Sequence, residues 1–197
     1  MFTTVLLCSR PFFYEEDMKL KAVLMDEPVI ERTLTRLSYE IVEKTDSLDN
    51  LILVGIRTRG IPLAQQIAAL VKQHTDRDVA TGELDITLYR DDLTTVAELP
   101  VVNSTAIDCD ITGMDVVLVD DVLYTGRTVR AAIDALFSIG RPKTIRVAVL
   151  VDRGHRELPI RADFVGKNIP TSRREVVSVH CIPVDGVCNV ELYEKDV

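Results

Sequence analysis

Two adjacent carboxylates and a small, hydroxyl-bearing segment lie close together near the middle of the chain. Asp120 and Asp121 follow an apolar run, and residues 125–128 read Thr-Gly-Arg-Thr. Backbone amides and hydroxyls that converge at a helix N-terminus bind phosphate. A carboxylate pair would repel phosphate, but it suits ribose hydroxyls or a magnesium-bound sugar. The pattern therefore predicts a ribose-phosphate site, and the alternative is an acidic turn at the end of a strand.

The predicted site needs a strand before it and a helix after it. Residues 116–119 form a continuous β-branched and aliphatic run, which is typical of a parallel strand covered on both faces. Residues 128–139 have helical apolar spacing, and Gly140 and Pro142 end the helix. The expected apolar face of this helix comprises Val129, Ala132, Ile133, Leu136 and Phe137.

The rest of the chain alternates strands with helices. Apolar runs predict a short edge strand at 21–25 and buried strands at 51–56 and 145–151. Helical spacing predicts helices at about 27–44 and 61–73. This alternation is typical of an α/β fold, in which a mostly parallel, twisted sheet carries helices on both faces.

A second polar loop follows the strand predicted at 51–56. Its residues 57–60 read Arg-Thr-Arg-Gly and combine cations, a hydroxyl and a flexible glycine. A diphosphate clamp needs such groups, and an ordinary arginine-rich turn is the alternative. Loops at the carboxyl ends of parallel strands meet along one edge of the sheet. We therefore expect this loop to lie beside the acid pair.

Two longer segments are expected near the site. Residues 79–89 alternate enough for a strand or a hairpin arm, and residues 89–113 read as a long polar loop. Loops of this length are often lids, so Arg90 is expected to close over a departing diphosphate. A surface hairpin without a catalytic part is the alternative. Residues 152–172 are rich in glycine, proline and charge, which predicts a structured excursion over the end of the sheet.

The C-terminal part is expected to complete a small hood over the sheet. Strands are predicted at 176–179 and 187–193, and Asp185-Gly186 is the turn signal between them. The hood would lie mainly at about 152–193, with strand amides available to the edge of a base.

Length and composition limit the remaining possibilities. The 197 residues suit one domain, expected at 18–197, and residues 1–17 are expected to be a non-core N-terminal extension, with Met18 as one hypothesis for the natural start. No apolar run is long enough to span a membrane, and the four cysteines lack metal or redox spacing, so a cytoplasmic location is expected. The net charge of −8 argues against general nucleic-acid affinity but permits a local basic face.

Residues 116–128 resemble the phosphoribosyl diphosphate (PRPP) signature of type I phosphoribosyltransferases. Residues 84–93, 121–130 and 151–172 resemble the PyrR family of bifunctional pyrimidine operon attenuators and uracil phosphoribosyltransferases, and the resemblance extends over residues 19–195. It implies the type I phosphoribosyltransferase fold and the conversion of uracil and PRPP into UMP and diphosphate. It also implies binding of pyr leader RNA that UMP or UTP favours, and a homodimer or a higher oligomer.

The resemblance implies a role for individual residues. The implied catalytic residues are Asp120, Asp121 and Arg90. The implied residues for PRPP and UMP are Thr58, Arg59, Gly60, Asp120, Asp121, Val122, Leu123, Tyr124, Thr125, Gly126, Arg127, Thr128, Arg153 and Val177. Magnesium is expected to be held mainly by PRPP, without firm protein ligands.

The implied RNA surface comprises Thr35, Arg36, His155, Arg156, Arg161 and Lys167. Four alternatives remain open. His155 and its neighbours could only shape the active site, the chain could be a uracil salvage enzyme without RNA regulation, or its transferase site could mainly sense nucleotide for an RNA regulator. A purine or orotate phosphoribosyltransferase would keep the phosphate loop and change the base pocket, and residues 153–172 argue against it.

Overall fold

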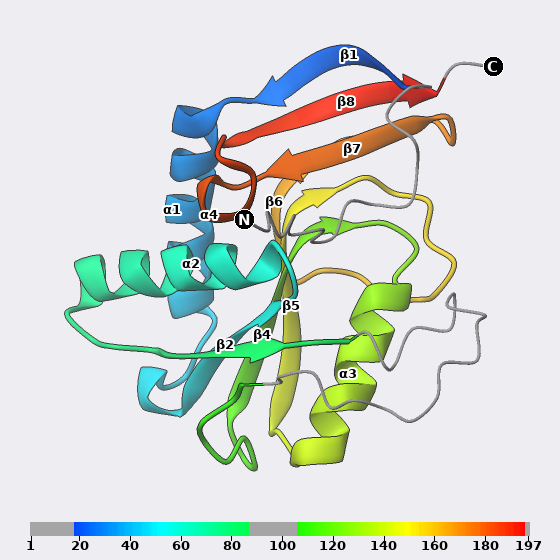
Figure 1. Ribbon diagram of the computed structural model, residues 1–197. Helices are drawn as coiled ribbons and strands as arrows, with labels where there is room; N and C mark the ends of the chain where they lie inside the picture. Colours follow the sequence, from blue (N-terminus) through cyan, green and yellow to red (C-terminus); the bar gives the residue numbers. More distant parts are fainter. Residues whose placement is uncertain (1–17, 87–105, 196–197) are drawn as a thin grey trace, which may run out of the picture.

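The computed structural model describes residues 18–86 and 106–195, which form two sheets (Figure 1). The larger sheet has five parallel strands in the order β3-β2-β4-β5-β6. Its strands are β2 (Leu51–Ile56), β3 (Ala80–Leu84), β4 (Asp115–Leu123), β5 (Thr144–Asp152) and β6 (Phe164–Asn168). The smaller, antiparallel sheet has the order β1-β8-β7. Its strands are β1 (Met18–Met25), β7 (Glu175–His180) and β8 (Asn189–Lys195).

Helices cover both faces of the larger sheet, as predicted. The helical segments are α1 (Glu27–Glu43), the 3-10 turn η2 (Leu48–Asn50), α2 (Gly60–Thr75), α3 (Arg127–Ile139) and α4 (Ile182–Asp185). Helices α1 and α2 contact each other on one face, and α3 lies on the opposite face (Figure 1). Within the described ranges, no helix has both the length and the apolar character that crossing a membrane would require.

Each face of the larger sheet has its own apolar core. All of β2 is buried, and its alternate residues point to opposite faces because side chains alternate along a strand. Leu51 and Leu53 join the core beneath α1 and α2, whereas Ile52 and Val54 join the core beneath α3. The run of apolar residues that predicts this strand is therefore the consequence of burial on both sides.

Two details of the predicted elements are refined. The strand predicted at 79–89 is β3, which pairs in parallel with β2, and Glu83 of β3 also forms an antiparallel bridge with Ala106. In α3, Val129 and Leu136 are buried as predicted, but Phe137 is 46% exposed. The Arg141 guanidinium lies over the Phe137 ring, 5.7 Å from its centroid, in a cation–π contact that keeps the ring at the surface.

The segment predicted to cover the sheet end also contains a strand that the sequence does not predict. Residues 164–168 form β6, which pairs with β5 as an edge strand of the larger sheet. Only Phe164 of β6 is fully buried, so this strand lacks an apolar run that sequence could reveal. The edge strand predicted at 21–25 is β1, which belongs to the smaller sheet and pairs with β8. The strands predicted at 176–179 and 187–193 are β7 and β8, with α4 and Gly186 (φ 75°) between them.

Candidate active site

The acid pair lies at the carboxyl end of β4, and this strand is longer than predicted. It continues through the two carboxylates to Leu123, since Asp120 pairs with Val149 and Leu123 pairs with Asp152. Asp120 Oδ1 accepts a hydrogen bond from the Asp121 amide at 3.0 Å. The strand therefore fixes the acid pair, rather than a turn that follows it.

The two carboxylates differ in their exposure to solvent. Asp120 is only 7% exposed, whereas Asp121 is partly exposed. Burial raises the pKa of Asp120, and the negative charge of Asp121 raises it further. Asp121 is therefore the better placed of the two to accept hydrogen bonds from a bound sugar.

The loop between β4 and α3 has the geometry of an anion site. Gly126 immediately precedes α3 and has φ 94°, a conformation that favours glycine. Among the described residues, the amides of Thr125, Gly126 and Thr128 have no hydrogen-bond acceptor. Unsatisfied amides at the first turn of a helix attract an anion through their partial charges and the helix dipole.

The carbonyls of the same loop are held by the segment that follows β5. The Arg153 amide donates to Leu123 O at 3.1 Å, and the amides of Glu157 and Leu158 donate to Thr125 O at 3.0 and 3.1 Å. A side chain at Gly126 would meet Leu158, since an added Cβ would lie 3.4 Å from Leu158 Cβ. The segment thus packs against the loop from the side of its carbonyls.

Arg153 is a buried cation that joins the loop to the smaller sheet. It is 6% exposed, and its guanidinium lies 4.2 Å from the centroid of the Tyr124 ring. It donates to Glu175 O at 2.5 Å and to Thr171 Oγ1 at 3.3 Å. Burial lowers the pKa of Arg153, but an arginine keeps its charge at neutral pH. Val177, the other residue implied for the base, is buried two positions after Glu175 in β7.

The loop predicted to clamp diphosphate reaches the same region. Arg59 directly precedes α2 and forms a bidentate ion pair with Asp185 of α4, at 3.0 Å from Nε to Oδ2 and 2.8 Å from Nη2 to Oδ1. The hydrogen bond that Arg59 donates to Asp185 raises the pKa of Arg59 against the effect of burial, and Asp121 adds a smaller electrostatic contribution. Arg59 therefore links the start of α2 to α4, within electrostatic range of Asp121. Thr58 is exposed beside it.

Gly60 has a packing role that the sequence does not indicate. A Cβ added at Gly60 would lie 2.3 Å from the Val119 carbonyl oxygen, one residue before the acid pair. Glycine is thus required because the start of α2 touches the backbone of β4 directly. The expected flexibility of this position is less important than its small size.

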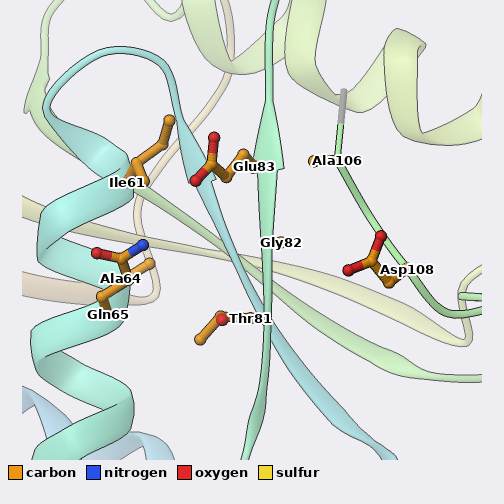
Figure 2. A pocket seen from close by; sticks show the side chains of 8 residues that line it. All are labelled: Ile61, Ala64, Gln65, Thr81, Gly82, Glu83, Ala106 and Asp108. Carbon is orange, nitrogen blue, oxygen red and sulfur yellow. The ribbon is translucent and has the colours of Figure 1, made fainter. Parts of the chain in front are cut away.

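A cavity of about 190 Å³ lies beside α2 and β3 (Figure 2), and neither acid of the pair lines it. Its lining comprises Ile61, Ala64, Gln65, Thr81, Gly82, Glu83, Ala106 and Asp108. None of these is a predicted site residue. The two carboxylates, Glu83 and Asp108, would repel a phosphate, so the cavity is not an extension of the ribose-phosphate site.

Most residues of the implied RNA surface are bound within the chain. Arg36 Nη2 donates to the carbonyls of Val165 and Gly166 at 3.0 and 2.6 Å, so it covers the outer edge of β6. Lys167 Nζ donates to Leu24 O at 3.0 Å. The Arg36 bonds join α1 to β6, and the Lys167 bond joins β6 to β1, but these bonds also occupy the cations.

The loop before β6 holds the other three polar residues of that surface differently. His155 has φ 58°, and its Nε2 donates to Thr171 O at 2.5 Å. Arg156 is hydrogen-bonded to several carbonyls of its own chain. Arg161 is exposed and, in the part of the chain that the structure describes, has no hydrogen bond or ion pair. Thr35, on α1, donates to Glu31 O at 2.8 Å.

Some site residues escape sequence reasoning, and one prediction lies outside the described residues. Asp185 reads as part of a turn, and nothing local in the sequence indicates that it binds Arg59, which is 126 residues away. Nothing local in the sequence indicates the role of Glu175, whose carboxylate accepts from Lys21 and whose backbone carbonyl accepts from Arg153. Arg90 and most of the lid expected at 89–113, up to residue 105, are not among the described residues.

Comparison with known proteins agrees with this geometry. Residues 23–181 match the phosphoribosyl transferase domain family. The chain is 54% identical to bifunctional protein PyrR of Clostridium novyi (strain NT), over 90% of this chain and 100% of the relative. It is 59% identical to bifunctional protein PyrR of Thermus aquaticus, over 91% and 99%.

Solved structures agree in fold. A hypoxanthine phosphoribosyltransferase of Staphylococcus aureus superposes with a TM-score of 0.67 at 20% identity, over 87% of this chain and 92% of that chain. The hypoxanthine phosphoribosyltransferase of Trypanosoma cruzi gives a TM-score of 0.67 at 16% identity, over 90% and 98%. The larger sheet and its helices thus have the fold of a phosphoribosyltransferase, and the chain belongs to the PyrR family within the phosphoribosyl transferase domain family.

Proposed function

We propose that this chain is a uracil phosphoribosyltransferase that also binds pyr leader RNA in response to uridine nucleotides and thereby regulates pyrimidine genes by transcription attenuation. The observation that carries the transferase is the acid pair at the end of β4, followed directly by unsatisfied amides at the start of α3. The bifunctional character rests on relatives named bifunctional protein PyrR, which are 54–60% identical.

In this proposal the phosphate loop holds the 5′-phosphate of PRPP, with the amides of Thr125, Gly126 and Thr128 as donors. Asp121 accepts hydrogen bonds from the ribose hydroxyls, and the more buried Asp120 supports its position through the hydrogen bond between them. Thr58 and Arg59 bind the diphosphate. Arg153 and the Val177 backbone border the uracil.

The chemistry is charge stabilisation rather than covalent catalysis. When the bond between ribose C1 and diphosphate breaks, the leaving group gains negative charge and the sugar gains oxocarbenium character. Arg59, and Arg90 from the expected lid, stabilise the leaving group, while the acid pair stabilises the sugar. Uracil N1 then bonds to C1 while the N1 proton passes to the departing diphosphate, and the products are UMP and diphosphate. No protein nucleophile is needed because the site aligns the two substrates.

Magnesium fits the donors at the end of β4, since it prefers oxygen ligands and retains water. The acid pair offers carboxylate oxygens for that ion or its waters, and PRPP supplies most of the coordination. Bound there, magnesium would neutralise part of the diphosphate charge. We also propose that the protein acts in the cytoplasm as a homodimer.

The transferase is tested by incubating the purified protein with uracil, PRPP and magnesium and measuring UMP. The regulator is tested on the same preparation by filter binding to the leader RNA of the protein's own operon, with and without UMP. The expected result is turnover to UMP and RNA binding that UMP tightens. Turnover of hypoxanthine or orotate in place of uracil would contradict the proposed substrate.

A uracil salvage enzyme without RNA regulation is the second candidate. The observation in its favour is that Arg36, Arg156 and Lys167 are already hydrogen-bonded to carbonyls of their own chain. Turnover to UMP without specific binding of leader RNA would establish it.

A further inference from the structure

Arg156 is enclosed by backbone carbonyls, although the family resemblance implies that it contacts RNA. Its side chain is 21% exposed. It donates from Nε to Ile160 O (3.0 Å), from Nη1 to Leu123 O (3.2 Å), Tyr124 O (2.6 Å) and Gly154 O (3.1 Å), and from Nη2 to Asp152. A planar guanidinium with five donors can satisfy several carbonyls at once. To contact an RNA phosphate, this side chain would have to abandon part of that network.

Two of these carbonyls belong to the loop that carries the proposed phosphate site. Leu123 and Tyr124 directly precede the amides of residues 125–128. Thr125 O is held by the amides of Glu157 and Leu158 at 3.0 and 3.1 Å. Three consecutive carbonyls of the phosphate loop are therefore bound by the segment 153–158. The carbonyl oxygens of the loop, which would repel an anion, are hydrogen-bonded on the side of this segment, and the loop amides remain available to the ligand.

The longer segment 153–161 carries two further residues of the proposed RNA surface, His155 and Arg161. His155 precedes Arg156, and Arg161 follows Ile160, whose carbonyl Arg156 holds. Arg161 is exposed, and no hydrogen bond or ion pair to another described residue restrains it. Arg156 thus lies between the back of the phosphate loop and the surface that carries His155 and Arg161.

We propose that Arg156 is the positioning residue that couples nucleotide binding to RNA binding, and that it is not itself an RNA contact. This inference rests on the proposed function. A phosphate bound by the loop amides fixes the loop, and Arg156 transmits that order to the segment 153–161 through the carbonyls of Leu123 and Tyr124. Coupling between two sites is reciprocal. RNA bound at Arg161 therefore tightens UMP to the same extent that UMP tightens RNA.

The test compares the dissociation constant of leader RNA without UMP with that at saturating UMP. A ratio of about fivefold or more is expected for the wild-type protein. Arg156→Lys keeps the positive charge but cannot reach several carbonyls with a planar fork, so the ratio is expected to fall to about one. Calorimetry of UMP with and without RNA should show the same loss. If Arg156→Lys keeps the wild-type ratio of the two RNA dissociation constants, the proposal is overturned.

Arg161→Ala is the matched contrast, because it removes an exposed cation of the same segment without touching the carbonyl network. It is expected to weaken RNA binding by the same factor with and without UMP, so its ratio stays at the wild-type value. Arg141→Ala controls for the loss of arginine–carbonyl bonds elsewhere, since Arg141 donates to Phe137 O at 2.7 Å at the far end of α3. If Arg156→Lys also weakens RNA binding by the same factor with and without UMP, Arg156 is an RNA contact and the proposal is wrong.

A measurement without RNA separates this inference from the proposed regulatory function. The amides of Arg153, Glu157 and Leu158 donate to carbonyls of the phosphate loop. UMP is expected to slow their hydrogen exchange in the wild-type protein but not in Arg156→Lys. If UMP binds and their exchange does not change, the coupling is refuted. If exchange slows but no leader RNA binds, the proposed regulation fails while the link between loop and segment stands.

Discussion

Replacing Asp185 with asparagine should release Arg59 for diphosphate. In the structure, Asp185 holds Arg59 with two hydrogen bonds, at 2.8 and 3.0 Å. If Arg59 binds diphosphate, the ligand must compete with this carboxylate. Asparagine keeps one acceptor oxygen for the Cys181 amide, which now donates to Asp185 at 2.9 Å, but it removes the charge. The variant therefore weakens the competitor and preserves the local fold.

The size of the effect follows from the exposure of the pair. Hydrogen bonds to charged groups contribute about 1.5–3 kcal/mol when they are well shielded. The Arg59 and Asp185 side chains are 25% and 17% exposed, so solvent screening reduces this value toward that of a surface pair. We expect a net change of about 1 kcal/mol, which corresponds to about fivefold tighter diphosphate binding.

Calorimetry with magnesium diphosphate and the KM for PRPP would both report this change. Asp49→Asn is a suitable control, because it removes an ion pair with Arg77, at 3.3 Å, that lies outside the site. The reasoning is refuted if Asp185→Asn folds normally but binds diphosphate more weakly than the wild-type protein. That result would mean that Asp185 holds Arg59 in its productive position.

Three further predictions concern other parts of the site and the fold. Asp121→Asn should raise the KM for PRPP more than Asp120→Asn does, because Asp120 is buried; steady-state kinetics would check this, and equal effects would contradict it. Glu175 accepts from Lys21, which lowers the pKa of Glu175 from 4.5 to about 2, so the ionised carboxylate stabilises the fold above about pH 4.5 and this stabilisation is lost as pH falls toward 2. The difference in unfolding free energy between wild type and Glu175→Gln should therefore shrink over that pH range in urea titrations, and a constant difference would argue against the ion pair. Gly60→Ala should lower the free energy of unfolding by about 1–3 kcal/mol in the same assay, because the methyl group would clash with the β4 backbone, and an unchanged value would show that α2 can shift.

The sequence predicts those elements whose buried residues form a continuous apolar run or a regular apolar stripe along the chain. The strand predicted at 51–56 has the observed bounds of β2, because both of its faces are covered and every residue is apolar. Helix α1 is equally clear, since Asp26 caps its first turn through a 3.0 Å bond from the Val29 amide and an apolar stripe follows. The phosphate loop is predictable for the same reason: its chemistry is contiguous along the chain.

Features that depend on distant partners could not be predicted from the sequence. Strand β6 has only two apolar side chains, followed by glycine and two polar residues, and it is recognisable only from its pairing with β5. The role of Asp185 depends on Arg59, and the role of Arg156 depends on carbonyls 32 and 33 residues earlier. A residue type at one position does not specify whether its charge faces solvent, a ligand or its own backbone.

The pairing of β1 with β8 has a consequence for the order of folding. Met18 pairs with Lys195, so the first and last described strands are neighbours in the smaller sheet. All strands of the larger sheet lie between residues 51 and 168. During synthesis, the larger sheet can therefore assemble while β1 is still without its partner. Closing so long a loop is entropically costly and slow. Of the described strands, the one that is made first thus pairs late, and the contact between Arg59 and Asp185, which lies four residues before β8, is completed in the same late stage.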